Sequence, residues 1–126
     1  MIRSKELENL LLDLYKSSIA GDLNFFQELI LNDDDVLTIG TDPHEYWLGY
    51  STIIEARSKI GDLASFQITP GDILAFTEGS VGWVADQPTL RLPNGTTTIF
   101  RFTAVFVNKV GKWQLAQQHV SIGVPN

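Results

Sequence analysis

The residues from position 42 to 45 carry the side chains best suited to chemistry. Asp42, His44 and Glu45 lie within four positions, and two aromatic residues follow them at once. A carboxylate beside aromatic rings can have a raised pKa and act as a general base, so Asp42 or His44 is a candidate base. The alternative is an ordinary polar turn, because Asp before Pro43 caps turns well. Three metal ligands on so short a loop seldom converge on one ion, so we expect no metal site.

A second polar group forms if the last strands pair as their turns suggest. The pair at 94–95, Asn-Gly, favours a two-residue hairpin turn, and Lys-Val-Gly at 109–111 fits a three-residue loop. This register places Arg101 opposite His119 and Asp86 diagonal to Arg101. Such a cluster could hold an anion or move a proton. The alternative is a hydrogen-bonded patch on the outer face of the sheet or at a dimer contact.

The same register gathers aromatic side chains on the opposite face, which we assign to the inside because helices need an apolar surface to cover. The expected lining of an internal pocket is Phe26, Trp47, Trp83, Phe102, Phe106 and Gln118. An apolar hollow with one or two polar groups is typical of small-molecule sites. Ordinary core packing is the alternative, and a bulge would exchange the two faces.

The elements that must position these side chains divide the chain into helices followed by strands. Ser4 predicts the start of a first helix, and Gly21 with Asp22 predicts its end and the start of a second. Ser51 is expected to cap a third helix that Gly61 closes. Strand-like runs cover 36–39, 66–76, 81–92, 96–107 and 113–122. This order predicts a single α+β domain over 1–126, with a curved, mostly antiparallel sheet wrapped around the N-terminal helices into a cone with an internal pocket.

Composition limits the classes of function. The 126 residues are 44% hydrophobic, carry a net charge of -6 and include no cysteine. An acidic chain argues against nucleic acid or an anionic membrane as a partner, and the lack of cysteine excludes disulfides and thiolate chemistry. No long apolar run and no secretion signal are recognisable, so we expect a cytoplasmic protein.

Three segments carry a resemblance to a known family: residues 20–23 (AGDL), 40–49 before a helix, and the tail at 101–121. In order and spacing they resemble the SnoaL-like branch of the nuclear-transport-factor-two-like superfamily. That superfamily includes isomerases, dehydratases, ligand binders and oligomerisation modules, so the resemblance implies the cone fold rather than one activity. Asp42 before Pro is similar to the catalytic pair of ketosteroid isomerases, but the places of their oxyanion donors hold Leu14 and Ala104. The tail is also similar to the hub domain of calcium/calmodulin-dependent kinase.

These observations predict a protein that holds a small apolar or amphipathic molecule and needs no cofactor. Two alternatives stay open: a cofactor-independent lyase or isomerase that uses Asp42 or His44 as base, and a structural module with a vestigial pocket. The outer sheet face is itself half apolar, which predicts a homodimer through that face.

Overall fold

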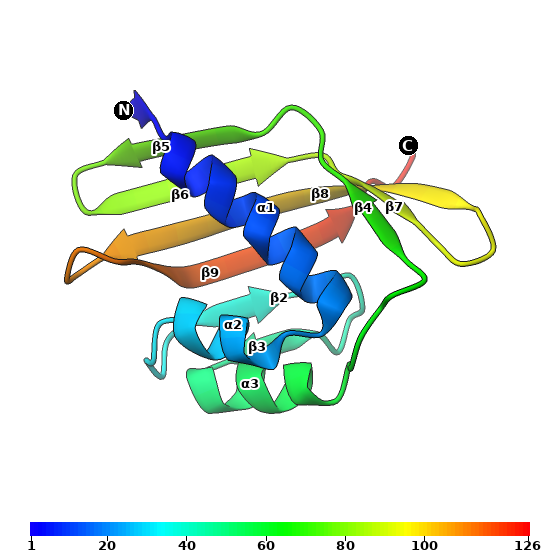
Figure 1. Cartoon of the computed structure of the whole chain (residues 1–126), viewed down its shortest axis with the longest axis horizontal. Helices are drawn as coiled ribbons and strands as arrows, with labels where there is room; N and C mark the ends of the chain where they lie inside the picture. Colours follow the sequence, from blue (N-terminus) through cyan, green and yellow to red (C-terminus); the bar gives the residue numbers. More distant parts are fainter.

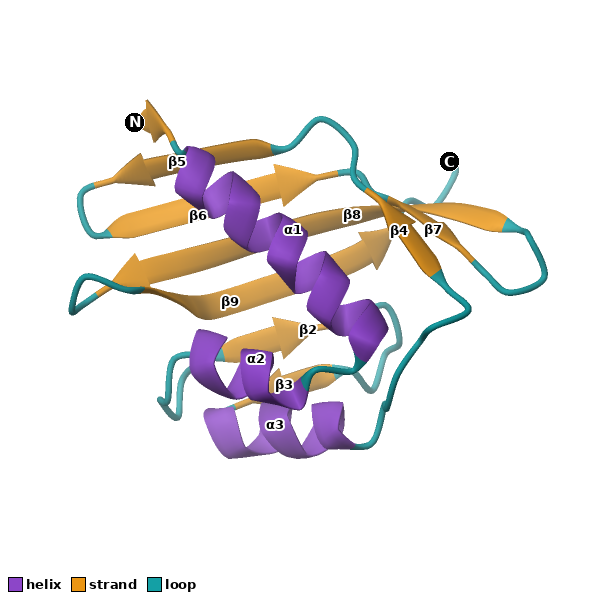
Figure 2. Cartoon of the chain, in the orientation of Figure 1, coloured by secondary structure: helices purple, strands orange, loops and turns teal.

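Three helices cover one face of a curved sheet, and the opposite face of the sheet carries no helix (Figures 1 and 2). The computed structural model describes residues 1–126. The helices are α1 (Lys5–Ala20), α2 (Leu23–Leu29) and α3 (Tyr50–Ser58). The strands are β1 (Ile2–Arg3), β2 (Leu37–Ile39), β3 (Tyr46–Leu48), β4 (Gln67–Thr69), β5 (Leu74–Glu78), β6 (Val81–Asp86), β7 (Thr89–Arg91), β8 (Thr97–Asn108) and β9 (Trp113–Ile122).

The ends of the first two helices follow from their capping residues. The hydroxyl of Ser4 accepts a hydrogen bond from the N–H of Leu7 at 3.1 Å and so begins α1. Gly21 ends α1 in the left-handed conformation, with φ at 65°, and the carboxylate of Asp22 accepts from the N–H of Phe25 to begin α2. All three predicted caps are confirmed.

The start of the third helix differs from the prediction. Residues 46–48 form β3, a short strand that pairs antiparallel with β2, and the chain turns directly from β3 into α3. Gly49 takes the N-cap position with φ at 95°, a conformation that favours glycine, and no side chain caps the helix. Ser51 therefore lies inside α3 and is not its cap, because the hairpin β2–β3 brings the helix start forward.

The sheet is mostly antiparallel. Its strand order is β1-β5-β6-β8-β9-β2-β3, and β7 joins β8 beyond this path, with β4 paired to β7. Only β2 runs parallel to its neighbour β9. The predicted run at 66–76 is divided into β4 and β5, and the run at 81–92 into β6 and β7, so that β4 and β7 splay away from the main sheet at one end (Figure 1).

The turn at residues 93–95 corrects the predicted register. Leu92 and Thr96 flank a three-residue loop, joined by a hydrogen bond of 2.9 Å from the N–H of Leu92. The prediction had used a two-residue turn, and the extra loop residue moves β6 by one position against β8. Consequently Trp83 pairs with Val105 rather than with Phe106. Trp83 thus points outward and Asp86 inward, opposite to the prediction.

A second correction concerns the start of β9. Asn108 pairs with Trp113 across a four-residue turn, and a bulge follows between Val105 and Phe106. Between the hairpin turn and the bulge, the longer turn shifts β9 by one position against β8. The side chains of Trp113 and Leu115 therefore lie on the inner face, although both were expected on the outer face. After the bulge, β9 is shifted by two positions against the predicted pairing with β8. Because side chains alternate between the two faces, a shift of two positions leaves the rest of β9 on its predicted faces.

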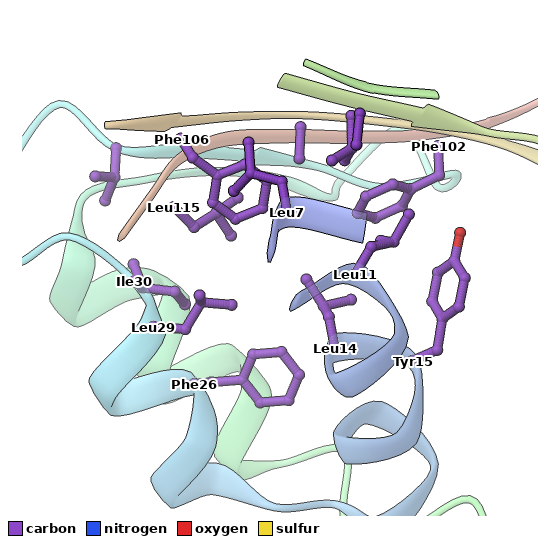
Figure 3. Packing of buried hydrophobic residues seen from close by; sticks show 14 of the residues in the cluster. Leu7, Leu11, Leu14, Tyr15, Phe26, Leu29, Ile30, Phe102, Phe106 and Leu115 are labelled. Atoms are coloured by element: carbon purple, nitrogen blue, oxygen red, sulfur yellow. The ribbon is translucent and has the colours of Figure 1, made fainter. Parts of the chain in front are cut away.

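The core lies between the helices and the inner face of the sheet. Figure 3 shows that side chains of α1 and α2 lie against Phe102 and Phe106 of β8 and Leu115 of β9. Gly82 on β6 leaves room for the side chain of Leu7 on α1, since a Cβ atom at this position would collide with it. None of the three helices combines the length and the apolar character that a membrane-spanning helix requires.

A candidate ligand cavity between the first helix and the sheet

A largely apolar cavity of about 200 Å³ lies between the second half of α1 and the inner face of the sheet. The segment after α3, with β4 and β7, also contributes to its lining. Figure 2 shows β4 and β7 together at one end of the sheet. Its lining residues are Leu14, Tyr15, Ser18, Leu63, Ile68, Pro88, Leu90, Phe100, Phe102, Gln118 and Val120. None of them carries a formal charge at neutral pH. Its volume is below the usual range for drug-sized ligands.

Gln118 is the most polar residue of this lining. It lies on β9, inward beside Ala104 of β8 and Thr38 of β2, and only 5% of its surface is exposed. Its Oε1 atom is buried and has no hydrogen-bond partner. A buried amide oxygen without a partner costs about 1–3 kcal/mol, so such a group in a native fold requires an explanation.

Tyr15 joins the cavity wall to a buried carboxylate. Its hydroxyl donates a hydrogen bond of 2.6 Å to Oδ2 of Asp86, and Figure 3 shows this hydroxyl directed toward the sheet beside Phe102. The rings of Tyr15 and Phe102 meet edge to face at 5.9 Å. Burial, and next the hydrogen bond to Asp86, raise the pKa of Tyr15 above its ordinary value.

Asp86 is fully engaged in hydrogen bonds. Besides the hydroxyl of Tyr15, its carboxylate accepts from the backbone N–H groups of Gly71 at 3.1 Å and Gln87 at 2.9 Å. It therefore ties α1 and the turn before β5 to the end of β6. Sequence reasoning missed this role because the predicted register pointed Asp86 outward; the helical spacing of Tyr15 with Leu14 and Ser18 was the signal for the inward tyrosine.

The predicted pocket residues lie in three places. Phe102 and Gln118 line the cavity. Phe26 and Phe106 belong to the close-packed core, and Trp47 packs against that core from β3. Trp83 lies on the outer face, where its ring is 6.1 Å from that of Phe76. Its placement in the pocket was wrong because the hairpin loop has three residues.

The predicted cluster of Asp86, Arg101 and His119 does not form. Asp86 is buried on the inner face, whereas Arg101 and His119 are exposed on the outer face. Arg101 is opposite Ser121, and His119 is opposite Thr103, since β9 is shifted by two positions against the predicted register. Arg101 and His119 thus lie on adjacent strands, on the face of the sheet opposite to Asp86.

The loop that carries Asp42 and His44 is exposed and lines none of the described cavities. Oδ1 of Asp42 accepts from the N–H of His44 at 2.8 Å, and Oε1 of Glu45 accepts from the N–H of Asp42 at 2.9 Å. These bonds are those of a self-capped turn. No group of three His, Asp or Glu side chains that could hold a metal ion is present in residues 1–126.

Arg57 is a half-buried cation that the candidate sites from the sequence did not include. Its guanidinium lies 3.7 Å from the centre of the Phe26 ring, and its Nε atom is buried without a partner. Burial lowers the pKa of Arg57 to about 10. The space beside it has a volume of only about 20 Å³, so this site can hold at most a water molecule.

The model of the SnoaL-like domain matches residues 7–125. The chain belongs to the SnoaL-like family. No curated protein matches its sequence.

Solved structures of this family's fold superpose on most of the chain. An NTF2-like protein of unknown function from Pseudomonas putida has a TM-score of 0.81 at 12% identity, over 95% of this chain and 86% of its own. A provisionally named dehydratase of the NTF2-like family from Streptomyces avermitilis has a TM-score of 0.79 at 15% identity, over 96% and 97%. The CaMKII hub of S. rosetta has a TM-score of 0.78 at 17% identity, over 95% and 96%. At these identities the likeness shows the shared fold, and a given fold hosts several functions.

Proposed function

We propose that this SnoaL-like protein binds a small, uncharged, largely apolar molecule in the cavity beneath α1. The observation that carries the proposal is a largely apolar cavity of about 200 Å³ whose lining includes no charged residue. An apolar cavity of about 150 Å³ engineered in another protein binds benzene, so this space suffices for a molecule of one or two rings.

The polar groups near the cavity favour binding over turnover. A general base must reach the reacting proton, directly or through one water molecule. Asp42 and His44 lie on an exposed loop outside the lining, and both oxygens of Asp86 already accept hydrogen bonds. We therefore propose a binding protein and not an Asp42- or His44-dependent lyase or isomerase.

We also propose that two copies associate through the outer face of the sheet. Apolar side chains from three adjacent strands gather there without a helix to cover them: Leu74, Phe76, Val81, Trp83, Val105 and Val107. Leu74 and Val81 are 46% and 40% exposed. A contiguous apolar patch of this kind is typical of a contact surface, and association of like copies about a twofold axis is the simplest arrangement.

Titration with toluene, followed by amide chemical shifts in NMR, tests cavity binding. We expect saturable shifts for Phe102, Gln118 and Val120, and we expect Val120→Phe to abolish them by filling the space. Val110→Phe is the matched control, because Val110 is 83% exposed in the β8–β9 turn. If the wild type shows no saturable shifts at these residues, the cavity does not bind such molecules and the structural-module alternative is favoured.

A further inference from the structure

We infer that a second site, outside the cavity beneath α1, binds small organic cations with an apolar body, such as protonated phenylalkylamines. The site is a groove of about 470 Å³ between the first half of α1, α2 and the turn that leads into β9. Figure 1 shows α1 and α2 diverging from their connection, with the start of β9 between them. The volume of the groove lies within the usual range for small-molecule sites.

Part of the groove surface is apolar. Its apolar lining residues are Leu10 of α1, Phe25 and Leu29 of α2, and Trp113 of β9. Leu10, Phe25 and Trp113 are only half-buried, so part of their surface is open to a bound molecule. An aryl or alkyl group that covers them removes apolar surface from water, and an aromatic ring also attracts an organic cation placed over its face.

The charged side chains of the groove are mostly acidic. Three carboxylates, those of Glu6, Asp13 and Glu28, accompany a single ammonium group, that of Lys112. Nζ of Lys112 lies 3.2 Å from Oε2 of Glu28, so these two charges neutralise each other. The carboxylates of Glu6 and Asp13 remain, in a chain whose net charge is -6. A cation is therefore attracted to this groove and an anion is repelled from it.

The two remaining carboxylates are placed where a bound amine can reach them. Glu6 and Asp13 are both exposed, and their spacing of seven positions puts them on one face of α1, about 10 Å apart along its axis. Leu10 lies between them on the same face, so an amine that pairs with either carboxylate can lay its apolar body on Leu10. Oε1 of Glu6 accepts a hydrogen bond of 2.8 Å from Nε1 of Trp113, which holds this carboxylate beside the indole ring.

This arrangement suits an organic cation better than a metal ion. A metal ion needs several ligands that converge on one point, but Glu6 and Asp13 lie two helical turns apart. No group of three His, Asp or Glu side chains that could hold a metal ion is present in the groove. An organic amine needs only one charge pair, and the apolar side chains beside it bind the rest of the molecule.

Three probes that share a phenyl body isolate the charge. At neutral pH phenethylamine is cationic, phenethyl alcohol is neutral and hydrocinnamate is anionic. NMR titration of the wild type, followed at the side-chain N–H of Trp113 and the backbone N–H of Gly111, measures the affinity of each probe for the groove. We expect the amine to bind about threefold to tenfold more tightly than the alcohol, and hydrocinnamate to bind most weakly. The preference for the amine should decline as salt is raised from about 0.01 M to about 1 M, because salt screens charge interactions.

Two changes of charge should move this preference in opposite directions. Glu6→Gln combined with Asp13→Asn removes both negative charges and keeps an oxygen at position 6 that can accept from Trp113, so the amine should bind no better than the alcohol. Lys112→Gln removes the only cation and should raise the affinity for the amine about twofold to threefold. Glu55→Gln on α3 removes an exposed carboxylate outside the groove and is the matched control, which should keep the wild-type preference.

The outcomes separate this site from the cavity beneath α1. Equal binding of the amine and the alcohol, tighter binding of the alcohol, or no saturable shift at Trp113 would overturn the inference. Shifts of Phe102 and Gln118 in place of Trp113 would put the amine in the cavity and would overturn it as well. Val120→Phe, which fills the cavity, should leave the titration of the groove unchanged, so the two sites can fail independently. The wild-type probe series decides by itself if a variant does not fold.

Discussion

The phenol oxygen of Tyr15 lies 2.6 Å from Oδ2 of Asp86, and this bond joins residues that are 71 positions apart in the chain. It links the middle of α1 to the end of β6, at the rim of the cavity. Two backbone N–H groups complete the carboxylate's partners. The pair therefore stabilises the position of α1 over the sheet, and with it the width of the cavity.

Substitutions of Tyr15 and of Asp86 should lower the free energy of unfolding by different amounts. Tyr15→Phe removes one donor and keeps the ring, so we expect a loss of about 1–2 kcal/mol in the free energy of unfolding. Asp86→Ala leaves the Tyr15 hydroxyl and two backbone N–H groups without their acceptor, so we expect a loss of about 3 kcal/mol or more. Urea denaturation measures both, and a greater loss for Tyr15→Phe would contradict the network described.

The raised pKa of Tyr15 predicts a specific pH dependence. The folded protein holds the phenol proton more tightly than the unfolded chain, in which it leaves near the ordinary value of 10.0. The titration of Tyr15 should thus leave the free energy of unfolding independent of pH below pH 9 and should lower it above pH 10, by at most about 1.4 kcal/mol per pH unit. The advantage of the wild type over Tyr15→Phe in urea denaturation should therefore shrink between pH 9 and pH 11. A difference that stays constant over this range would show that the phenol ionises as readily in the folded state.

Much of the fold could be predicted because local signals determine it. The caps at Ser4, Gly21 and Asp22 depend only on near neighbours, and the long alternation of β8 identifies Phe102 and Phe106 as inward residues. The match to the SnoaL-like domain confirms the α+β class that this order of elements predicts.

The polar part of the site could not be predicted because it depends on single-residue shifts. Asn94-Gly95 suits a two-residue turn, but Gly95, with φ at 88°, also suits the final position of a three-residue loop. That choice decides whether Asp86 or Trp83 points inward. Gln118 kept its predicted face only because the longer β8–β9 turn and the bulge beside Phe106 each add one residue to the shift. No local sequence pattern indicates either the longer turn or the bulge.

Removal of the candidate bases should leave binding intact. Asp42→Asn keeps an oxygen that can accept from the N–H of His44, so the loop should retain its shape, and His44→Gln removes the imidazole. Because neither residue lines the cavity, we expect the double variant to bind toluene within twofold of the wild type, as measured by NMR titration. A loss of tenfold or more would place this loop at the ligand and restore the base as a candidate.

A charge on the outer sheet face should dissociate the proposed dimer. Val105 lies opposite Trp83 in the centre of the apolar patch, so Val105→Asp would place one carboxylate from each copy in a contact that excludes water. Burial of such unpaired charges costs several kcal/mol, enough to shift a dimer with micromolar affinity to monomers. Sedimentation velocity at about 50 μM, a concentration well above such a dissociation constant, should show a dimer for the wild type and a monomer for Val105→Asp. Val110→Asp adds the same charge at an exposed turn and should remain dimeric. If Val105→Asp sediments as the wild type does, the copies associate elsewhere; if both variants dissociate, net charge rather than this patch controls association.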